Sequence, residues 1–315
     1  MMSSQDDLLK LLGLVFLLLV VATSIGKILA RKTTEANASV IENLNARINS
    51  WWVMVILLSI AFLGGKTGVI LLFCLCSIAA LREFSQLADT GQKDPWALYA
   101  AYCCILPIQY LLIWYEWYGL YSIFIPVYAF LILPILSAFR ETTDQFLLRI
   151  SQTQWALMIC VFCASHVPAL LSLNITGYED RQVLLIAFLI IVVQLSDVLQ
   201  YVWGKLFGKR LLAPTLSPSK TWEGAVGGVL SATMIGAALW WITPFKPLQA
   251  AGLALVCALM GLLGGLVLSA IKRDKGIKDW GNVIAGHGGF IDRLDSILFS
   301  APVFFHLVRY GWDIS

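Results

Sequence analysis

QVLLIAFLIIVVQLSDVLQYVW, residues 182–203, is a long apolar stretch in which Asp197 is the only charged residue. A helix needs about 20 consecutive, mostly apolar residues to cross a bilayer, so this stretch predicts a membrane-spanning helix. Similar stretches recur along the 315-residue chain, which is 59% hydrophobic and 13% charged and has a mean hydropathy of +0.80. This composition excludes a soluble domain and predicts an all-α, polytopic integral membrane helical bundle.

We expect about 10 transmembrane helices from the spacing of the apolar runs. Their predicted ranges are 8–30, 51–65, 66–81, 96–115, 119–139, 153–173, 182–203, 224–243, 248–271 and 296–311. The second and third ranges are short, which leaves a single re-entrant pair open as an alternative. No small-residue cleavage pattern follows the long first run, so we expect a helix there and no removed signal peptide.

The basic residues divide unevenly between the two sides of the membrane that ten spans define. One side receives Arg31, Lys32, Arg47, Arg82, Lys93, Arg140, Arg149, Lys205, Lys209, Arg210, Lys220, Lys272, Arg273, Lys275, Lys278 and Arg293; the other receives Lys66, Arg181, Lys246 and Arg309. Cytoplasmic loops carry the excess of Lys and Arg. We therefore expect a protein of the cell's inner membrane, with its polar segments in the cytoplasm and both termini outside. The net charge of +3 mostly records this orientation and gives no support for nucleic acid binding.

The richest polar segment runs from Ser269 to Asp295 and includes KRDKGIKDWGNVIAGHGGFIDRLD. Its charged residues are Lys272, Arg273, Asp274, Lys275, Lys278, Asp279, Asp292, Arg293 and Asp295. Carboxylates are hard oxygen ligands for Mg²⁺, which usually shares its coordination shell with substrate phosphates. Lys and Arg neutralise the remaining phosphate charge. The segment therefore predicts a site that holds a metal and phosphate groups together.

Three carboxylates of this segment, Asp279, Asp292 and Asp295, are the predicted metal ligands. If Asp292 and Asp295 are helical, their i,i+3 spacing places both on one face, and the first turn of that helix offers backbone N–H groups to an anion. The alternative is a capping pair beside Arg293. The predicted phosphate-binding cations are Lys220, Lys272, Arg273, Lys278 and Arg293; a topology signal or an anionic-lipid contact is the alternative for such a basic cluster.

Glycines surround His287 in this segment. Gly286, Gly288 and Gly289 permit backbone conformations that suit a loop wrapped around a phosphate. We expect His287 to donate to a phosphate or to position a carboxylate, with a purely structural histidine as the alternative.

A second polar segment runs from Ser196 to Gly224. Asp197 begins it, and an ionisable residue inside a spanning helix is usually functional; a pairing with Lys205 or Lys209 at the interface is the alternative. The Ser217-Pro218-Ser219-Lys220-Thr221 stretch predicts a phosphate-binding turn, because it combines hydroxyls, backbone donors and a cation. Taken alone, it is also typical of an ordinary loop before a helix.

Small residues predict close packing between the two helices at 224–243 and 248–271. The glycines are Gly224, Gly227, Gly228, Gly261, Gly264 and Gly265, and such spacing lets spanning helices approach closely. This packing would bring the two polar segments together and place Lys220 beside Asp279.

The motifs of both segments resemble those of the phosphatidate cytidylyltransferase (CDP-diacylglycerol synthase) family. The family elements Ser-x-x-Lys-Arg, Lys-Asp-x-Gly, His-Gly-Gly and Asp-Arg-x-Asp are matched at Ser269, Lys272, Arg273, Lys278, Asp279, Gly281, His287, Gly288, Gly289, Asp292, Arg293 and Asp295. Gly-x-x-Phe-Gly-Lys and Ser-Pro-x-Lys-Thr-x-x-Gly are matched from Gly204 to Lys209 and from Ser217 to Gly224. In the N-terminal part, only Arg82, Glu83 and Phe84 resemble a short element seen in relatives.

Two positions depart from the family pattern. Ala285 replaces the Pro that usually precedes Gly-His-Gly-Gly, which loosens the backbone without removing a ligand. Val198, Leu199 and Gln200 replace the small residues that commonly follow the intramembrane Asp. We expect these bulkier side chains to reshape the nucleotide or lipid pocket, and so to affect the substrate more than the class of reaction.

The resemblance implies transfer of a cytidylyl group from CTP to phosphatidic acid, which gives CDP-diacylglycerol and pyrophosphate for phospholipid biosynthesis. It implies Mg²⁺ as the cofactor, with a second, monovalent cation left open, and CTP, phosphatidic acid and the bilayer as partners, with a homodimer left open. The implied catalytic residues are Lys278, Asp279, His287, Asp292, Arg293 and Asp295. The implied substrate-binding residues are Asp197, Ser217, Lys220, Thr221, Lys272, Arg273, Gly288 and Gly289.

We expect two units, with residues 1–181 anchoring the chain and enclosing lipid, and residues 182–315 forming the catalytic unit with the signature at 269–295. Three alternatives stay open. A divergent paralogue would activate another lipid phosphate or use another nucleotide. A transporter would use Asp197 and broken helices near the midplane of the bilayer, and a non-catalytic scaffold would keep the fold alone.

Overall fold

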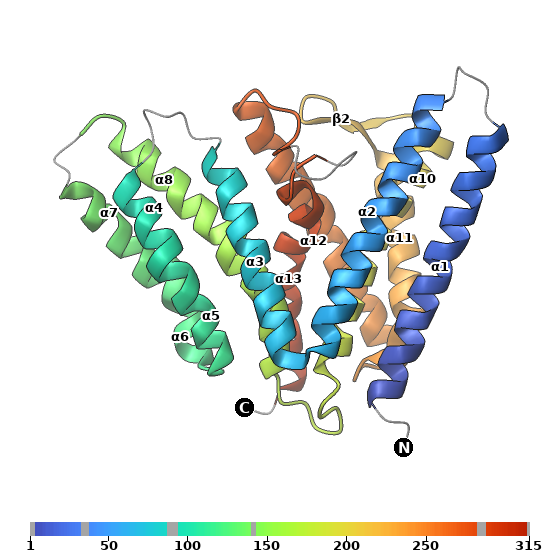
Figure 1. Ribbon diagram of the computed structural model, residues 1–315, viewed down its shortest axis with the longest axis horizontal. Coiled ribbons are helices and arrows are strands. Elements are labelled where there is room, and N and C mark those ends of the chain that lie inside the picture. Colours follow the sequence, from blue (N-terminus) through green and yellow to red (C-terminus); the bar gives the residue numbers. More distant parts are fainter. Residues whose placement is uncertain (1–3, 33–37, 87–93, 140–142, 282–287, 314–315) are drawn as a thin grey trace.

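The chain forms a membrane bundle in which helices run between two ends of the molecule (Figure 1). The computed structural model describes residues 4–32, 38–86, 94–139, 143–281 and 288–313. The helices are α1 (Ser4–Lys32), α2 (Ala38–Leu63), α3 (Gly65–Gln86), α4 (Pro95–Ala100), α5 (Leu106–Trp114), α6 (Tyr118–Ile123), α7 (Phe130–Ala138), α8 (Phe146–Leu157), α9 (Ala164–Ala169), α10 (Gln182–Phe207), α11 (Trp222–Ala238), α12 (Pro247–Asp274) and α13 (Ile291–Trp312).

Some of these helices are halves of one span. π-helical turns at Ala101–Ile105, Phe124–Ala129 and Met158–Cys163 join α4 to α5, α6 to α7 and α8 to α9. In the described part of the chain, eight helical stretches are long and apolar enough to cross a membrane. The other two predicted spans are α2, whose apolar part is only Ile48–Leu63, and α13, which carries charged residues in its first turns. The all-α polytopic fold is thus confirmed.

The re-entrant alternative for the second and third spans is wrong. α2 has 26 residues and α3 has 22, and both extend through much of the height of the bundle, diverging from the sharp turn that joins them (Figure 1). Gly65 makes that turn with a φ of +61°, a conformation that glycine adopts without strain. The polar start of α2, before Ile48, hid the true length of this helix from a hydropathy argument.

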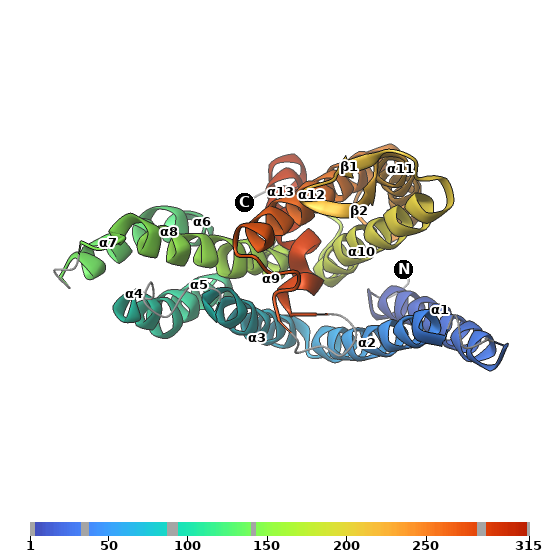
Figure 2. The same ribbon diagram turned by 90° about the horizontal axis from the view of Figure 1, so that it is seen from above.

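The helices are arranged in two rows, which Figure 2 shows from above. One row contains α1 to α5, and the other contains α6 to α13. Helix α13 stands where the rows meet and contacts α3, α9, α10 and α12. Buried aromatic residues fill its lower half, where the Phe188 and Phe304 rings stack 5.8 Å apart. The residues at the start of α13 are therefore surrounded by elements from distant parts of the sequence.

The polar segment after α10 forms a short antiparallel hairpin, the only strands in the described residues. β1 (Leu211–Ala213) pairs with β2 (Ser217–Thr221), with Leu211 opposite Thr221. The Glu223 carboxylate closes the hairpin, since it accepts the backbone N–H groups of Lys209 at 3.0 Å and Arg210 at 3.2 Å. The predicted phosphate-binding turn at Ser217–Thr221 is thus an extended strand, because Pro218 and the ladder keep its backbone straight.

The glycines pack different helices from the pair that we expected. A β-carbon at Gly228 of α11 would lie 2.5 Å from the backbone nitrogen of Gln200 in α10, and one at Gly264 of α12 would lie 2.5 Å from Phe299 in α13. Gly224, Gly227 and Gly228 therefore bring α11 onto α10, and Gly261, Gly264 and Gly265 bring α12 onto α13 and towards Lys220. The expected packing of α11 on α12 is also present, but a different glycine makes it: a β-carbon at Gly236 of α11 would overlap Ala254 Cβ of α12.

We expect Gly228→Ala to lower the midpoint of thermal denaturation in detergent, because its β-carbon would overlap Gln200. Overpacking of this kind costs about 1–3 kcal/mol. Gly252→Ala is the matched control, since nothing lies within 4 Å of a β-carbon at that position of α12. An unchanged midpoint for Gly228→Ala would contradict the close contact between α10 and α11.

Candidate active site

The centre of the candidate site is a pair of acidic side chains where α10 crosses α13. The Ser296 hydroxyl lies 2.6 Å from Asp197 Oδ2 and 3.2 Å from Asp295 Oδ1, so one hydroxyl touches both carboxylates. The backbone N–H of Ser296 also donates to Asp295 Oδ1 at 2.7 Å. Two carboxylates this close repel each other unless a cation lies near them. The prediction that Asp197 belongs to the polar site, and not to an interfacial pair with Lys205 or Lys209, agrees with this geometry.

Lys220 of β2 supplies one such cation. A β-carbon at Gly265 of α12 would lie 3.1 Å from Lys220 Nζ and 3.7 Å from Asp295 Oδ2, so both charged groups face the same bare stretch of helix. We expected Lys220 beside Asp279, and the structure places it beside Asp295. The packing of α12 on α13 explains the difference, since it turns the glycine face of α12 towards Asp295.

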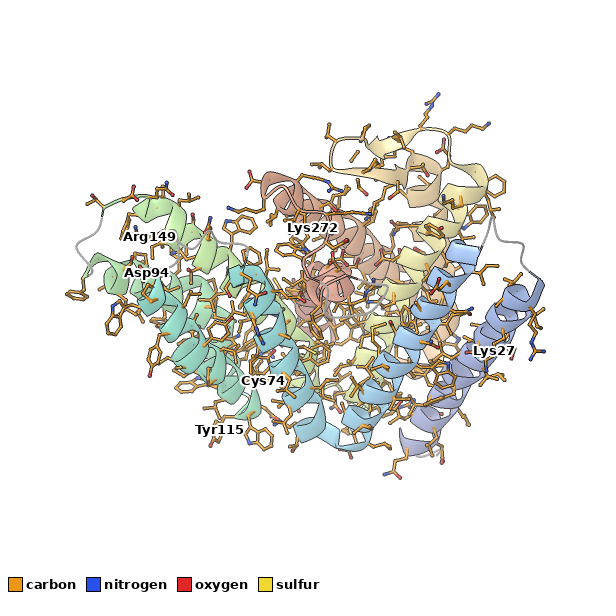
Figure 3. All side chains as sticks on the ribbon, turned by 45° about the horizontal axis from the view of Figure 1, so that its top comes forward. Lys27, Cys74, Asp94, Tyr115, Arg149 and Lys272 are labelled. Atoms are coloured by element: carbon orange, nitrogen blue, oxygen red, sulfur yellow. The ribbon has the colours of Figure 1, made fainter. Side chains whose placement is uncertain are left out.

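Asp292, one helical turn before Asp295, has a different set of partners. Its Oδ1 accepts from Lys272 Nζ at 2.7 Å. Its Oδ2 accepts the backbone N–H groups of Trp280 and Gly289, each at 2.9 Å. Lys272 lies at the end of α12, in the middle of the molecule between α3 and the hairpin (Figure 3). Asp292 therefore ties α12 and the glycine-containing segment to the start of α13.

Gly288 brings Asp279 to the same place. It has a φ of +79°, and a β-carbon there would lie 2.8 Å from Asp292 Oδ2 and 3.2 Å from Asp279 Cβ. Asp279 is exposed on its other side. Gly288 thus links Asp279 to Asp292, and Asp295 follows Asp292 one helical turn later. Among the described residues, however, no group of three His, Cys, Asp or Glu side chains has the arrangement of a metal site.

The remaining predicted site residues lie at the edge of the site or hold its elements in place. Lys278 is exposed, and Arg273 is exposed while donating to the carbonyls of Leu216 and Ile277. Thr221 caps α11, since its hydroxyl accepts from the Gly224 backbone N–H at 3.1 Å. Ser217 is half-buried in β2. His287 lies outside the described residues.

One contributor was missed by sequence reasoning. Glu83 of α3 is only 5% exposed, and its two oxygens accept the backbone N–H groups of Phe290 at 2.6 Å and Ile291 at 2.9 Å. The N–H of Gly289 is taken by Asp292. The expectation that the start of α13 offers free N–H groups to a substrate anion is therefore wrong for these three donors, because carboxylates of the chain already occupy them. The resemblance of the Arg82-Glu83-Phe84 element was the only signal.

Fold and site together define a membrane-embedded protein that gathers carboxylates and lysines at one end of its bundle, a setting suited to a substrate with phosphate groups. The profile of the cytidylyltransferase family matches residues 45–311. The chain belongs to this family, and it is accordingly a nucleotidyltransferase.

Individual relatives differ in how much of the chain they match. The uncharacterized protein YnbB from Escherichia coli (strain K12) is 37% identical over 304 residues, which is 96% of this chain and 98% of that protein. The phosphatidate cytidylyltransferase of Staphylococcus aureus (strain COL) is 36% identical over 160 residues, or 49% of this chain and 61% of the enzyme. That of Aquifex aeolicus (strain VF5) is 38% identical over 144 residues, or 46% of this chain and 54% of the enzyme. The match thus spans little more than half of these two enzymes.

We expect Gly288→Ala to reduce the nucleotidyltransferase activity at least about tenfold, since displacing a reacting group by an ångström costs up to about 100-fold. The added β-carbon would push Asp292 and Asp279 apart. Gly276→Ala is the matched control: Gly276 also has a positive φ, of +68°, but nothing lies within 4 Å of its β-carbon position. Equal steady-state rates for the two variants would contradict the crowding at Gly288.

Proposed function

We propose that the protein transfers a cytidylyl group from CTP to phosphatidic acid, giving CDP-diacylglycerol and pyrophosphate. The observation that carries the proposal is the meeting of Asp197, Asp295 and Lys220 beside the Asp292–Lys272 pair. In a member of the cytidylyltransferase family, such a cluster is suited to bind a triphosphate. The likeness to phosphatidate cytidylyltransferases supports phosphatidic acid as the acceptor.

The chemistry requires no covalent intermediate on the protein. A phosphate oxygen of phosphatidic acid attacks the α-phosphorus of CTP, a new P–O–P bond forms, and the bond to the β-phosphate breaks with pyrophosphate leaving. The phosphate is already a competent nucleophile, so the task of the protein is positioning and charge stabilisation. We assign Lys220, Lys272 and the half-buried Arg293 to the phosphates inside the site, and the exposed Lys278 and Arg273 to its edge. Ser217, Thr221 and Gly289 shape the elements that carry these cations.

The acidic residues fit a divalent cation such as Mg²⁺. Asp197 and Asp295 are two carboxylates on one hydroxyl, an arrangement that an additional cation would stabilise. Asp292 has Lys272 and two backbone N–H groups as partners already, so we give it a positioning role next to the metal, with Asp279 near its open side. Mg²⁺, when bound, would supply positive charge to the phosphates. A second, monovalent cation, a role for His287 and a homodimer stay predictions.

We also propose that the end with the hairpin faces the cytoplasm. Lys209, Arg210, Lys220, Lys272 and Arg273 all belong to segments at this end, and cytoplasmic segments carry the excess of basic residues. CTP is then delivered from the cytoplasm, and phosphatidic acid from the bilayer.

A second candidate acceptor is another lipid phosphate. YnbB matches nearly the whole chain, whereas the two phosphatidate cytidylyltransferases match about half of it. Gln200, one of the departures from the family pattern, is 8% exposed and donates to Ser196 Oγ at 2.9 Å, directly before Asp197. A changed residue this close to the acidic pair favours a test of several acceptors.

The direct test supplies purified protein in detergent–lipid micelles with CTP, Mg²⁺ and phosphatidic acid, and measures liponucleotide and pyrophosphate together. We expect both products in equal amounts. Replacing phosphatidic acid with other lipid phosphates separates the two candidates. Products with those acceptors alone would contradict phosphatidic acid as the substrate, and no product with any acceptor would favour a scaffold.

We expect Asp295→Asn to lower kcat at least about 100-fold, the scale on which one preorganised electrostatic contact acts. The change removes one charge of the pair and leaves the shape of the side chain intact. Asp274→Asn is the control, because Asp274 is an exposed carboxylate at the end of α12. Comparable kcat values for the two variants would show that the charge of Asp295 has no role in the reaction.

We expect Lys272→Met to raise the KM for CTP and to lower kcat, since it removes a phosphate-binding cation and leaves Asp292 without its 2.7 Å partner. Losing one partner of a largely buried ion pair costs about 3–5 kcal/mol. Lys275→Met, three residues further along the chain, is the control for charge alone. Equal changes of KM and kcat in the two variants would show that only the overall positive charge of this end affects the reaction, and not the position of Lys272.

A further inference from the structure

Glu83 is a charged residue from the other row of helices that lies almost completely buried at the candidate site. It sits near the end of α3, and the chain between it and the start of α13 includes α4 to α12. Its carboxylate accepts two backbone N–H groups, from Phe290 at 2.6 Å and from Ile291 at 2.9 Å. A buried carboxylate is costly unless such donors compensate it, and the first N–H groups of a helix carry partial positive charge. Glu83 therefore fixes the start of α13.

The same carboxylate lies against both flanks of the glycine-containing segment. A β-carbon at Gly281 would lie 3.0 Å from Glu83 Oε1, and one at Gly289 would lie 2.7 Å from Oε2. Next to it, the Phe84 and Trp280 rings stack 5.1 Å apart. The end of α3 thus touches residues on both sides of the 282–287 segment.

These contacts lead directly to Asp292. The residues that Glu83 and Phe84 hold, Gly289 and Trp280, are the ones whose backbone N–H groups donate to Asp292 Oδ2. Asp292 in turn binds Lys272. A shift of the Glu83 contacts would therefore move the donors of Asp292, and with them the lysine that we assign to phosphate.

We propose that Glu83 is a positioning residue for the transfer reaction: it clasps the start of α13 and the flanks of the 282–287 segment, and so holds Asp292 and Lys272 in place. The inference rests on the proposed function for its effect on the rate. It assigns a part of the site to α3, where sequence analysis placed only anchoring and lipid enclosure. It also means that a substrate phosphate does not bind the N–H groups of Phe290 and Ile291.

A first experiment measures hydrogen–deuterium exchange of residues 288–292 in the full-length protein, for wild type, Glu83→Gln and Glu83→Ala. Glu179→Gln is the matched control, because Glu179 also accepts a backbone N–H, from Gly177 at 2.9 Å, in the loop before α10. We expect faster exchange in this segment for both Glu83 variants, more for Ala than for Gln, because an amide oxygen still accepts one N–H. Unchanged exchange in Glu83→Ala would overturn the clasp, and this holds whether or not the wild type is active with CTP.

A second experiment measures kcat and the KM for CTP of the same variants, with the thermal midpoint as a check on folding. A displaced site of this kind costs about 10- to 100-fold in rate, so we expect kcat to fall by that factor in Glu83→Ala and by less in Glu83→Gln, with a KM that is not lowered. A lowered KM in Glu83→Gln would show that Glu83 competes with the substrate, and an unchanged kcat in Glu83→Ala would show that the clasp has no role in the reaction; either result overturns the proposal. An inactive wild type would refute the proposed function alone.

Discussion

The structure depends on bringing two carboxylates, Asp197 and Asp295, to one hydroxyl inside a membrane bundle. Charged groups away from water are stable only with partners. The neighbouring elements supply these partners and the space that they need. The α12 glycines let this helix lie against α13 and leave room for the Lys220 ammonium. The hairpin after α10 carries that lysine back over the site, and Thr221 and Glu223 fix the hairpin to α11. The local features of the C-terminal helices thus follow from one electrostatic requirement.

The backbone N–H groups and the lysines of the site have different anionic partners. The N–H groups at the start of α13 are occupied by Glu83 and Asp292, carboxylates of the chain itself. Lys272 of α12 is paired with Asp292, and Lys220 of β2 faces Asp295; these are the lysines that we propose for the phosphates of a substrate. The carboxylates therefore hold the backbone at the start of α13 in place, and the proposed reaction would rely on the cations for positioning and charge stabilisation.

The sequence predicted the fold because membrane helices reveal themselves by hydropathy alone. It failed at α2, whose polar start is invisible to that argument, and at Ser217–Thr221, where pairing with β1 decided the backbone. The residues of the site were predicted by their charge and by family resemblance, but their pairing was not. Lys220 faces Asp295 across Gly265, because the glycines pack α12 on α13, and the spacing of residues within one helix does not reveal such packing between helices. Glu83 was missed as a site residue since its contacts join positions more than two hundred residues apart.

The division into an anchoring unit, 1–181, and a catalytic unit, 182–315, stays a prediction, and Glu83 and Phe84 show contacts that cross it. The family match, which begins at residue 45, also includes α3. Both observations are consistent with a catalytic site that needs helices from both rows (Figure 2).

A Mn²⁺ titration followed by electron paramagnetic resonance tests whether Asp197 and Asp295 hold a divalent cation, with Mn²⁺ as the probe. We expect a bound ion in the wild type and in Asp274→Asn, and loss of that ion in the Asp197→Asn, Asp295→Asn double variant. An ion bound equally well by the double variant would contradict the claim that these two carboxylates form the centre of the site.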